Sequence, residues 1–159
     1  MNREEFIAHI RGEQEQLRRF LLALCLGNRD EADDIAQESL VKAYLSSSGY
    51  QDKGKFTSWL YRIAHHTFLD HMKNRKSLQP LDTAYDIADS SMPADSSFRY
   101  QELYAALDTL PPKERSSILL FYIKGYSVKE ICLITDSSED AVKKQLSRGR
   151  EHLKTKLKR

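Results

Sequence analysis

The chain has 159 residues, of which 40% are hydrophobic and 30% charged, with only 6 glycines and 4 prolines. This composition excludes a disordered or fibrous protein and allows either one domain or two small ones. The 25 Lys and Arg against 23 Asp and Glu leave a net charge of +2, which by itself favours no class of partner. Two cysteines far apart exclude a disulfide framework, and the longest apolar runs are much shorter than the ~20 residues of a membrane span. We therefore expect a cytoplasmic protein with no membrane contact of its own.

The first half of the chain has the periodicity of helices. Apolar residues recur at three- and four-residue intervals from Leu17 to Cys25, and this stripe stops near Gly27. A second helix is predicted over residues 30–45, with acidic residues in its first turns, where the helix dipole favours negative charge. A third helix is predicted over residues 56–73. No alternating apolar pattern of useful length indicates a strand, so the predicted fold class is all-α.

Residues 77–98 lack helical periodicity and are rich in Ser, Asp, Pro and Ala, with four Asp and no Lys or Arg. A structureless loop of this length is unusual inside one compact domain. We interpret it as a flexible acidic linker. The sequence therefore predicts two small helical domains, residues 1–76 and 99–159.

The second domain is predicted to hold four shorter helices, the first of which ends before a Pro-Pro pair and the second at a glycine. Ser127 and Glu130 match the capping-box pattern at the start of the next helix. Ser138 is the expected N-cap of the last helix. A short helix, a tight turn and a basic helix form the layout of a helix-turn-helix.

On a helical wheel the last helix divides into an apolar seam and a cationic face. The expected seam consists of Val142, Leu146, Gly149, Leu153 and Leu157. Lys143, Lys144 and Arg148 point away from it. Such a face can contact base edges and phosphates in a DNA groove, although a solvated charged surface is the simpler alternative.

Charge is distributed in blocks along the chain. Residues 30–52 carry a net charge of −5, from six acidic side chains and one lysine. Residues 53–76 carry +5 and residues 141–159 carry +7. Two basic blocks separated by acidic segments indicate two sites for a polyanion and at least one surface for a different partner.

The first basic block also contains aromatic residues. Lys55 and Arg62 flank the aromatic residues Phe56, Trp59 and Tyr61. Cations that follow a backbone, next to aromatic faces that stack on bases, suit single-stranded nucleic acid. The alternative is that Phe56 and Trp59 belong to the core of a small helical bundle.

At this point the motifs resemble a known family. Residues 30–44, DEADDIAQESLVKAY, and 56–64, FTSWLYRIA, resemble conserved region 2 of bacterial sigma factors. Residues 107–115, LDTLPPKER, 125–131, GYSVKEI, and 141–150, AVKKQLSRGR, resemble region 4. With only a short linker between them, the chain resembles the extracytoplasmic-function (ECF) subgroup of the sigma-70 family.

The resemblance implies a dissociable initiation subunit of RNA polymerase. Its partners would be bacterial core polymerase, through the β′ clamp helices and the β flap, promoter DNA and an anti-sigma factor. The residues implied to dock on the clamp helices are Asp33, Asp34, Gln37 and Glu38. Those implied to engage and help open the −10 element are Lys55, Phe56, Trp59 and Arg62. Those implied to enter the major groove of the −35 element are Ser138, Lys143, Lys144 and Arg148.

The chain departs from the family pattern in several places. His65 and His66 stand where the family usually has Arg-Asn. Asp136 and Ser137 replace a glycine and an apolar residue in the turn, and Asp140 stands near the start of the last helix in place of a glycine. We therefore expect an altered −35 preference.

Two other classes of protein are weighed against this one. A conventional helix-turn-helix regulator would bind promoters without being a polymerase subunit, but it leaves the cation–aromatic segment unexplained. An enzyme is not expected, because no nucleotide-binding, metalloprotease or hydrolase motif occurs, and we expect no cofactor and no metal. The opposed charge blocks also raise the hypothesis that the two domains close on each other when the protein is free.

Overall fold

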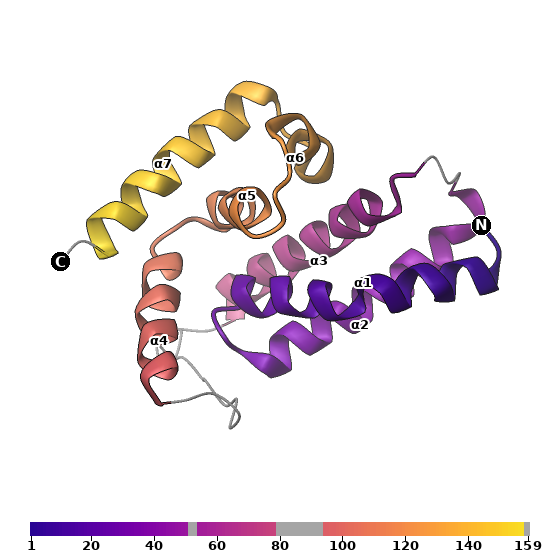
Figure 1. The fold of residues 1–159 in the computed structure, drawn as a ribbon, viewed down its shortest axis with the longest axis horizontal. Coiled ribbons are helices and arrows are strands. Elements are labelled where there is room, and N and C mark those ends of the chain that lie inside the picture. Colours follow the sequence, from indigo (N-terminus) through magenta and orange to yellow (C-terminus); the bar gives the residue numbers. More distant parts are fainter. Residues whose placement is uncertain (51–53, 79–93, 158–159) are drawn as a thin grey trace.

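The computed structural model describes residues 1–50, 54–78 and 94–157, and within them every regular element is a helix (Figure 1). The prediction of an all-α fold is confirmed. The elements in chain order are α1 (Arg3–Leu24), α2 (Arg29–Ser46), the short 3-10 helix η1 (Ser47–Gly49), α3 (Phe56–Leu78), α4 (Ala94–Asp108), α5 (Pro112–Tyr122), α6 (Val128–Thr135) and α7 (Glu139–Leu157).

The helices on both sides of the expected linker are longer than the sequence analysis predicted. Helix α3 continues to Leu78 and α4 begins at Ala94, so both ends of the segment 77–98 are helical. Residues 79–93, the centre of that segment, lie outside the described residues.

Side chains cap the helices at the predicted Ser127 and Ser138, and also at Asn28, which the sequence analysis did not predict. The Asn28 Oδ1 atom accepts a hydrogen bond from the Glu31 amide, 3.1 Å away, at the start of α2. Ser127 and Glu130 form the complete capping box of α6. The Ser138 Oγ atom accepts from the Ala141 amide at 3.1 Å and thereby caps α7. These bonds satisfy backbone groups that have no partner inside the helix.

Helices α1, α2 and α3 form the N-terminal domain around an apolar core. Full burial of each large apolar side chain contributes about 1.5–3 kcal/mol to folding. The fully buried members include Leu17, Phe20, Leu21, Leu24, Ile35, Leu60 and Phe68.

In the C-terminal domain, α7 packs against α5 along the predicted seam. Val142, Leu146 and Gly149 are buried, whereas Leu157 is 42% exposed, so the seam is shorter than predicted. Gly149 permits the close approach: a Cβ atom there would lie 2.6 Å from Cγ1 of Ile118.

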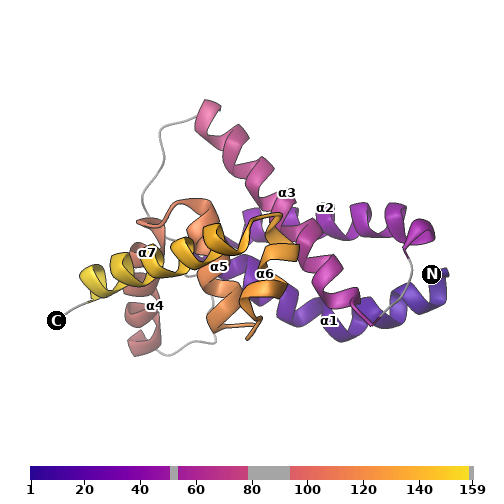
Figure 2. The ribbon, with the colours of Figure 1, turned by 90° about the horizontal axis from the view of Figure 1, so that it is seen from above.

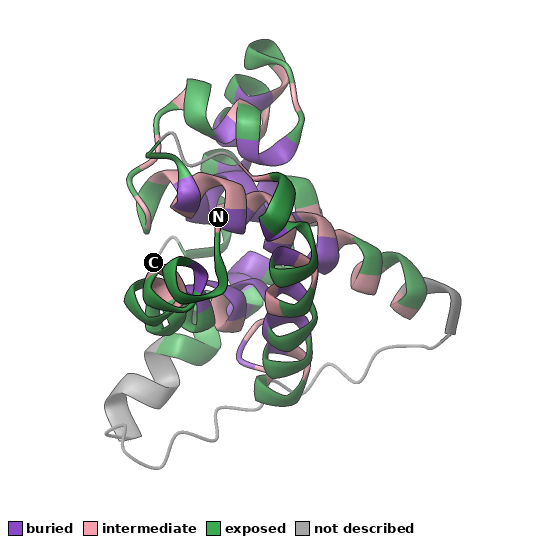
Figure 3. Ribbon diagram, turned by 90° about the vertical axis from the view of Figure 1, so that its right-hand side faces the viewer, coloured by how far each residue is buried: buried purple, intermediate pink, exposed green. Residues whose placement is uncertain are grey.

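The two domains pack together, as the hypothesis of a closed form expects. Helices α5 and α6 lie across α1 and α3 (Figures 1 and 2), and one apolar core runs through both domains. Figure 3 shows buried residues where the helices meet and exposed residues on their outer faces. None of the described helices is long and apolar enough to cross a bilayer.

Candidate polymerase and nucleic-acid interfaces

The four residues predicted to bind polymerase lie on the outer surface of α2. All four side chains are exposed: Asp33, Asp34, Gln37 and Glu38. In Figure 1, α2 is on the side of the N-terminal domain away from α6 and α7. The structure therefore leaves this acidic surface open while the two domains are closed.

Neighbouring side chains hold part of this acidic surface in place. Glu38 Oε2 lies 2.7 Å from His71 Nε2, and Glu38 Oε1 lies 3.4 Å from Lys42 Nζ. The hydrogen bond to His71 is the main cause of the lowered pKa of Glu38. Asp33 Oδ1 lies 3.5 Å from the Arg18 guanidinium. Glu38 is thus a charged carboxylate at neutral pH, and its orientation is set by α3.

The same helix exposes apolar side chains that the sequence analysis did not single out as functional. Leu45 is 73% exposed and Val41 58% exposed. Tyr44 is also exposed, although its ring makes an edge contact with Phe6, with centroids 5.5 Å apart. The spacing of Val41 and Leu45 from Gln37 places them on the same side of the helix. Exposed apolar groups beside charged ones are typical of a protein-binding surface.

The four residues predicted to contact the −10 element, at the start of α3, have different environments in the structure. Phe56 is buried and stacks on His9, with ring centroids 4.6 Å apart, so in this structure it has the core position of the alternative interpretation. Trp59 is half-buried and stacks on Tyr50, with centroids 4.4 Å apart and planes at 23°. Lys55 is exposed. The accessible part is a cation next to an aromatic pair, in which the contribution of Tyr50 had no clear signal in the sequence.

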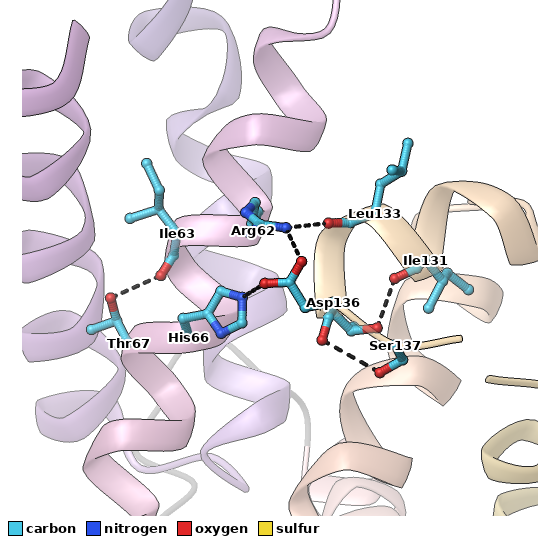
Figure 4. A network of polar contacts seen from close by, with 9 residues as sticks. Arg62, Ile63, His66, Thr67, Ile131, Leu133, Asp136 and Ser137 are labelled. Atoms are coloured by element: carbon cyan, nitrogen blue, oxygen red, sulfur yellow. Dashed lines mark hydrogen bonds and ion pairs between the residues drawn. The ribbon is translucent and has the colours of Figure 1, made fainter. Parts of the chain in front are cut away.

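Arg62, the fourth of these residues, contacts the C-terminal domain (Figure 4). Its Nη1 atom donates to the backbone oxygen of Leu133 at 2.8 Å and to Oδ1 of Asp136 at 2.5 Å. Nε2 of His66, one turn further along α3, lies 3.3 Å from the other oxygen of Asp136. The hydrogen bond from Arg62 is the main cause of the lowered pKa of Asp136.

A second polar contact between the domains is buried. His65 Nδ1 and Ser116 Oγ lie 2.9 Å apart, and both side chains are almost inaccessible. Burial, with a smaller contribution from His66, lowers the pKa of His65 to about 3. The imidazole is therefore neutral at physiological pH. On the same side of α3, Lys124 Nζ lies 4.9 Å from the centre of the Tyr61 ring.

The cationic face of α7 is open. The side chains of Lys143, Lys144 and Arg148 are exposed, and Ser138 is exposed at the N-cap. Lys143 Nζ lies 3.4 Å from Glu139 Oε1, an ion pair between exposed groups that contributes little to stability. The helix presents these donors as a major-groove reader requires. Within the described ranges 1–50, 54–78 and 94–157, no group of three or more His, Cys, Asp and Glu side chains could hold a metal.

Comparison with known families matches both halves of the chain. The family described as Sigma-70 region 2 matches residues 9–78, and Sigma-70, region 4 matches residues 100–153. The ECF RNA polymerase sigma factor SigW of Bacillus subtilis is 34% identical over 146 residues, which cover 83% of this chain and 78% of that protein. The ECF RNA polymerase sigma factor EcfG of Rhodopseudomonas palustris is 30% identical over 143 residues, covering 89% and 78%.

Solved structures show the same fold. The sigma factor RpoE of Bartonella quintana, crystallised with the anti-sigma factor NepR, superposes with a TM-score of 0.80 at 23% identity, covering 98% of both chains. CnrH, in complex with the cytosolic domain of CnrY, gives a TM-score of 0.72 at 20% identity, covering 98% of this chain and 89% of that one.

Region 2 followed by region 4 is the layout of a regulatory subunit of RNA polymerase rather than of an independent DNA-binding regulator. The chain belongs to the ECF group of RNA polymerase sigma factors.

Proposed function

We propose that this ECF sigma factor binds core RNA polymerase through α2, the opened −10 strand through the start of α3, and the −35 duplex through α7. The observation that supports this division most directly is the opposite charge of two exposed surfaces. The outer face of α2 is acidic and partly apolar, whereas the outer face of α7 is cationic. A protein partner and a polyanion are the partners that these two surfaces fit.

At the polymerase, Asp33, Asp34, Gln37 and Glu38 would contact the β′ clamp helices, with Val41 and Leu45 adding apolar area to the same interface. The C-terminal domain would lie near the β flap. The charged groups would guide association, and the apolar ones would contribute through burial. The chemistry of transcription would be carried out by the polymerase, and this chain would act without a catalytic residue or cofactor of its own.

At the promoter, Lys55 and Arg62 would contact the strand backbone and Trp59 would offer a stacking surface to an unpaired base. Loss of base stacking costs a few kcal/mol, which an aromatic contact partly replaces. In the −35 element, Lys143, Lys144 and Arg148 would contact base edges and phosphates, with Ser138 at the entry of the helix. For Phe56, burial in the core favours a role in positioning α3.

We further propose that the protein works in the cytoplasm, where the polymerase is, and that an anti-sigma factor holds it inactive. Two proteins of the same fold have been crystallised with partners described as an anti-sigma factor and as the cytosolic domain of CnrY. The domain limits proposed for this chain are 1–76 and 99–159, with 77–98 between them.

The test is capture by purified bacterial core polymerase, followed by run-off transcription across a promoter library. Stable capture with discrete start sites is the expected result. Binding to duplex DNA by the protein alone, without capture, would instead support a conventional helix-turn-helix regulator.

A further inference from the structure

One side of α3 is covered by the C-terminal domain, and it is the side that carries Arg62. Four residues of α3, spaced three or four apart or adjacent, contact α5, α6 or the segments next to them: Tyr61, Arg62, His65 and His66. Because three- and four-residue spacings share one face of a helix, these contacts define a single docking face.

Two departures from the family pattern meet at this face. His66 lies in the pair that replaces Arg-Asn, and Asp136 occupies the turn position where a glycine is usual. The two residues are 70 positions apart in the chain, yet Nε2 of His66 is 3.3 Å from Oδ2 of Asp136. Figure 4 shows both, with Arg62, around one carboxylate.

The backbone at Asp136 does not explain the presence of a carboxylate there. Asp136 ends α6 in the left-handed conformation, with φ of 53° and ψ of 42°. Glycine adopts this conformation without the steric cost that a Cβ atom imposes. The turn would therefore form more easily with glycine, and what Asp136 adds is its pair of oxygens facing α3.

We propose that Asp136 is an internal substitute for a DNA phosphate, which occupies the guanidinium of Arg62 and keeps the free sigma factor closed. The Asp136 carboxylate and the Leu133 carbonyl accept the hydrogen bonds that Arg62 would otherwise donate to a promoter strand. We name the set Arg62, His66, Leu133 and Asp136 the Arg62–Asp136 latch. This inference rests on the proposed role of Arg62 at the −10 element.

The latch covers α3 but not α2. Closure therefore withholds Arg62 from DNA, while Lys55 and the Trp59–Tyr50 pair stay accessible and the acidic face of α2 stays available to polymerase. The expected sequence of events is capture through α2, separation of the domains, and only then contact between Arg62 and the promoter. Because the Arg62–Asp136 pair is partly exposed and acts together with other contacts, its removal is expected to raise the open-to-closed ratio about two- to tenfold.

The test compares Asp136→Gly and Asp136→Asn with the wild-type full-length chain. Asp136→Gly removes the carboxylate and relieves the left-handed backbone, so the turn keeps its fold. Asp136→Asn removes only the charge and gives a smaller effect. The matched control is Glu151→Gln, which removes one negative charge from an exposed position of α7 in the same domain. Circular dichroism checks that all variants keep their helix content.

Two measurements are made at one salt concentration. The first is the distance distribution between spin labels attached to exposed positions of α1 and α7. The second is the affinity for a fluorescein-labelled single-stranded DNA 12-mer of random sequence. Apparent affinity is proportional to the fraction of open molecules. We expect Asp136→Gly to broaden the distances and to bind the 12-mer about two- to tenfold more tightly than Glu151→Gln.

The latch is overturned if both Asp136 variants keep the wild-type distance distribution. Longer distances without any gain in affinity over Glu151→Gln would show that Asp136 holds the domains closed, but would overturn its role as a substitute for a DNA phosphate at Arg62. Failure of polymerase capture in the separate transcription test would overturn the proposed function. It would not affect the spin-label distances, which are measured on the free protein.

Discussion

Arg115, at the start of α5, donates a hydrogen bond from Nη1 to the backbone oxygen of Leu24, the last residue of α1, at 2.8 Å. The same guanidinium donates to the backbone oxygens of Leu107 at 3.1 Å and Leu110 at 3.3 Å. Arg115 is only 5% exposed. One buried side chain thus closes the turn between α4 and α5 and bonds to the carboxyl end of a helix in the other domain, where a positive charge is favoured.

Replacement of Arg115 by methionine is expected to lower the free energy of unfolding by about 2–4 kcal/mol, because three backbone oxygens lose a charged donor. Urea unfolding followed by circular dichroism measures this change. The control is Arg19→Met, because Arg19 is exposed and so is its ion pair with Glu15, 2.8 Å away; it should change stability by less than about 0.5 kcal/mol. Equal effects of the two variants would contradict the bridging role of Arg115.

Gly149 is expected to be the glycine least tolerant of a side chain within a helix. Alanine at this position would place Cβ within 2.6 Å of Ile118, and overpacking of this kind costs about 1–3 kcal/mol. Thermal unfolding of Gly149→Ala should show this loss of stability. In a chain that already carries Ile118→Ala, the same Gly149→Ala change should cost less, because the clashing side chain is gone. The control, Gly12→Ala, meets no atom within 4 Å and should stabilise α1 by up to about 1 kcal/mol. A neutral Gly149→Ala would show that α7 can move away from α5.

Replacing Asp33, Asp34 and Glu38 with alanine is expected to weaken capture by core polymerase about tenfold or more, because charges that guide association are lost. Binding is measured with labelled polymerase, and circular dichroism should report unchanged helix content. The matched control removes three exposed carboxylates from α1: Glu4, Glu5 and Glu15. If the control weakens capture equally, net charge rather than the α2 surface determines binding.

Lys144→Ala combined with Arg148→Ala is expected to weaken binding to −35 duplex DNA. If both side chains contact phosphates, the slope of log affinity against log salt should fall by about 1.8, at roughly 0.9 per contact. The control removes Arg11 and Arg19, two exposed cations of α1. A slope unchanged in the α7 variant would exclude these side chains from phosphate contact.

The closed form should lose stability in acid because of His65. Its pKa is about 3 when it is buried against Ser116, and in an open form the ring would return toward the ordinary value of 6.5. Only the open form then binds a proton between these values, so closure is strongest above pH 6.5 and weakens as the pH falls from 6.5 toward 3. His66 and Lys113 also lower the pKa of His65, whereas Asp136 raises it.

The measurement is the spin-label distance distribution at pH 7.5, 6.0 and 5.0, with His65→Gln as the control, since glutamine can bond to Ser116 but does not titrate. We expect the open population to grow in acid in the wild type and to change less in the control. A closed population that grows in acid would contradict the role given to His65.

Local sequence patterns determined most of the secondary structure and the class of protein. The capping residues Ser127, Glu130 and Ser138 act within one turn of the backbone they satisfy, so they can be identified without knowledge of the fold. The cationic face of α7 follows in the same way from helical spacing, and so does the apolar seam up to Leu153. Leu157 differs because an apolar residue at the right spacing is buried only where another helix still lies opposite it.

The tertiary structure alone decided which of these residues are accessible and what they contact. Phe56 and Trp59 are similar in the sequence, but Phe56 is inside the bundle and Trp59 pairs with Tyr50 nearer the surface. The contacts of Arg62 with Leu133 and Asp136 join residues more than 70 positions apart. Such contacts depend on how the two domains pack against each other at α3. The periodicity of α3 or of α6 alone does not predict that packing.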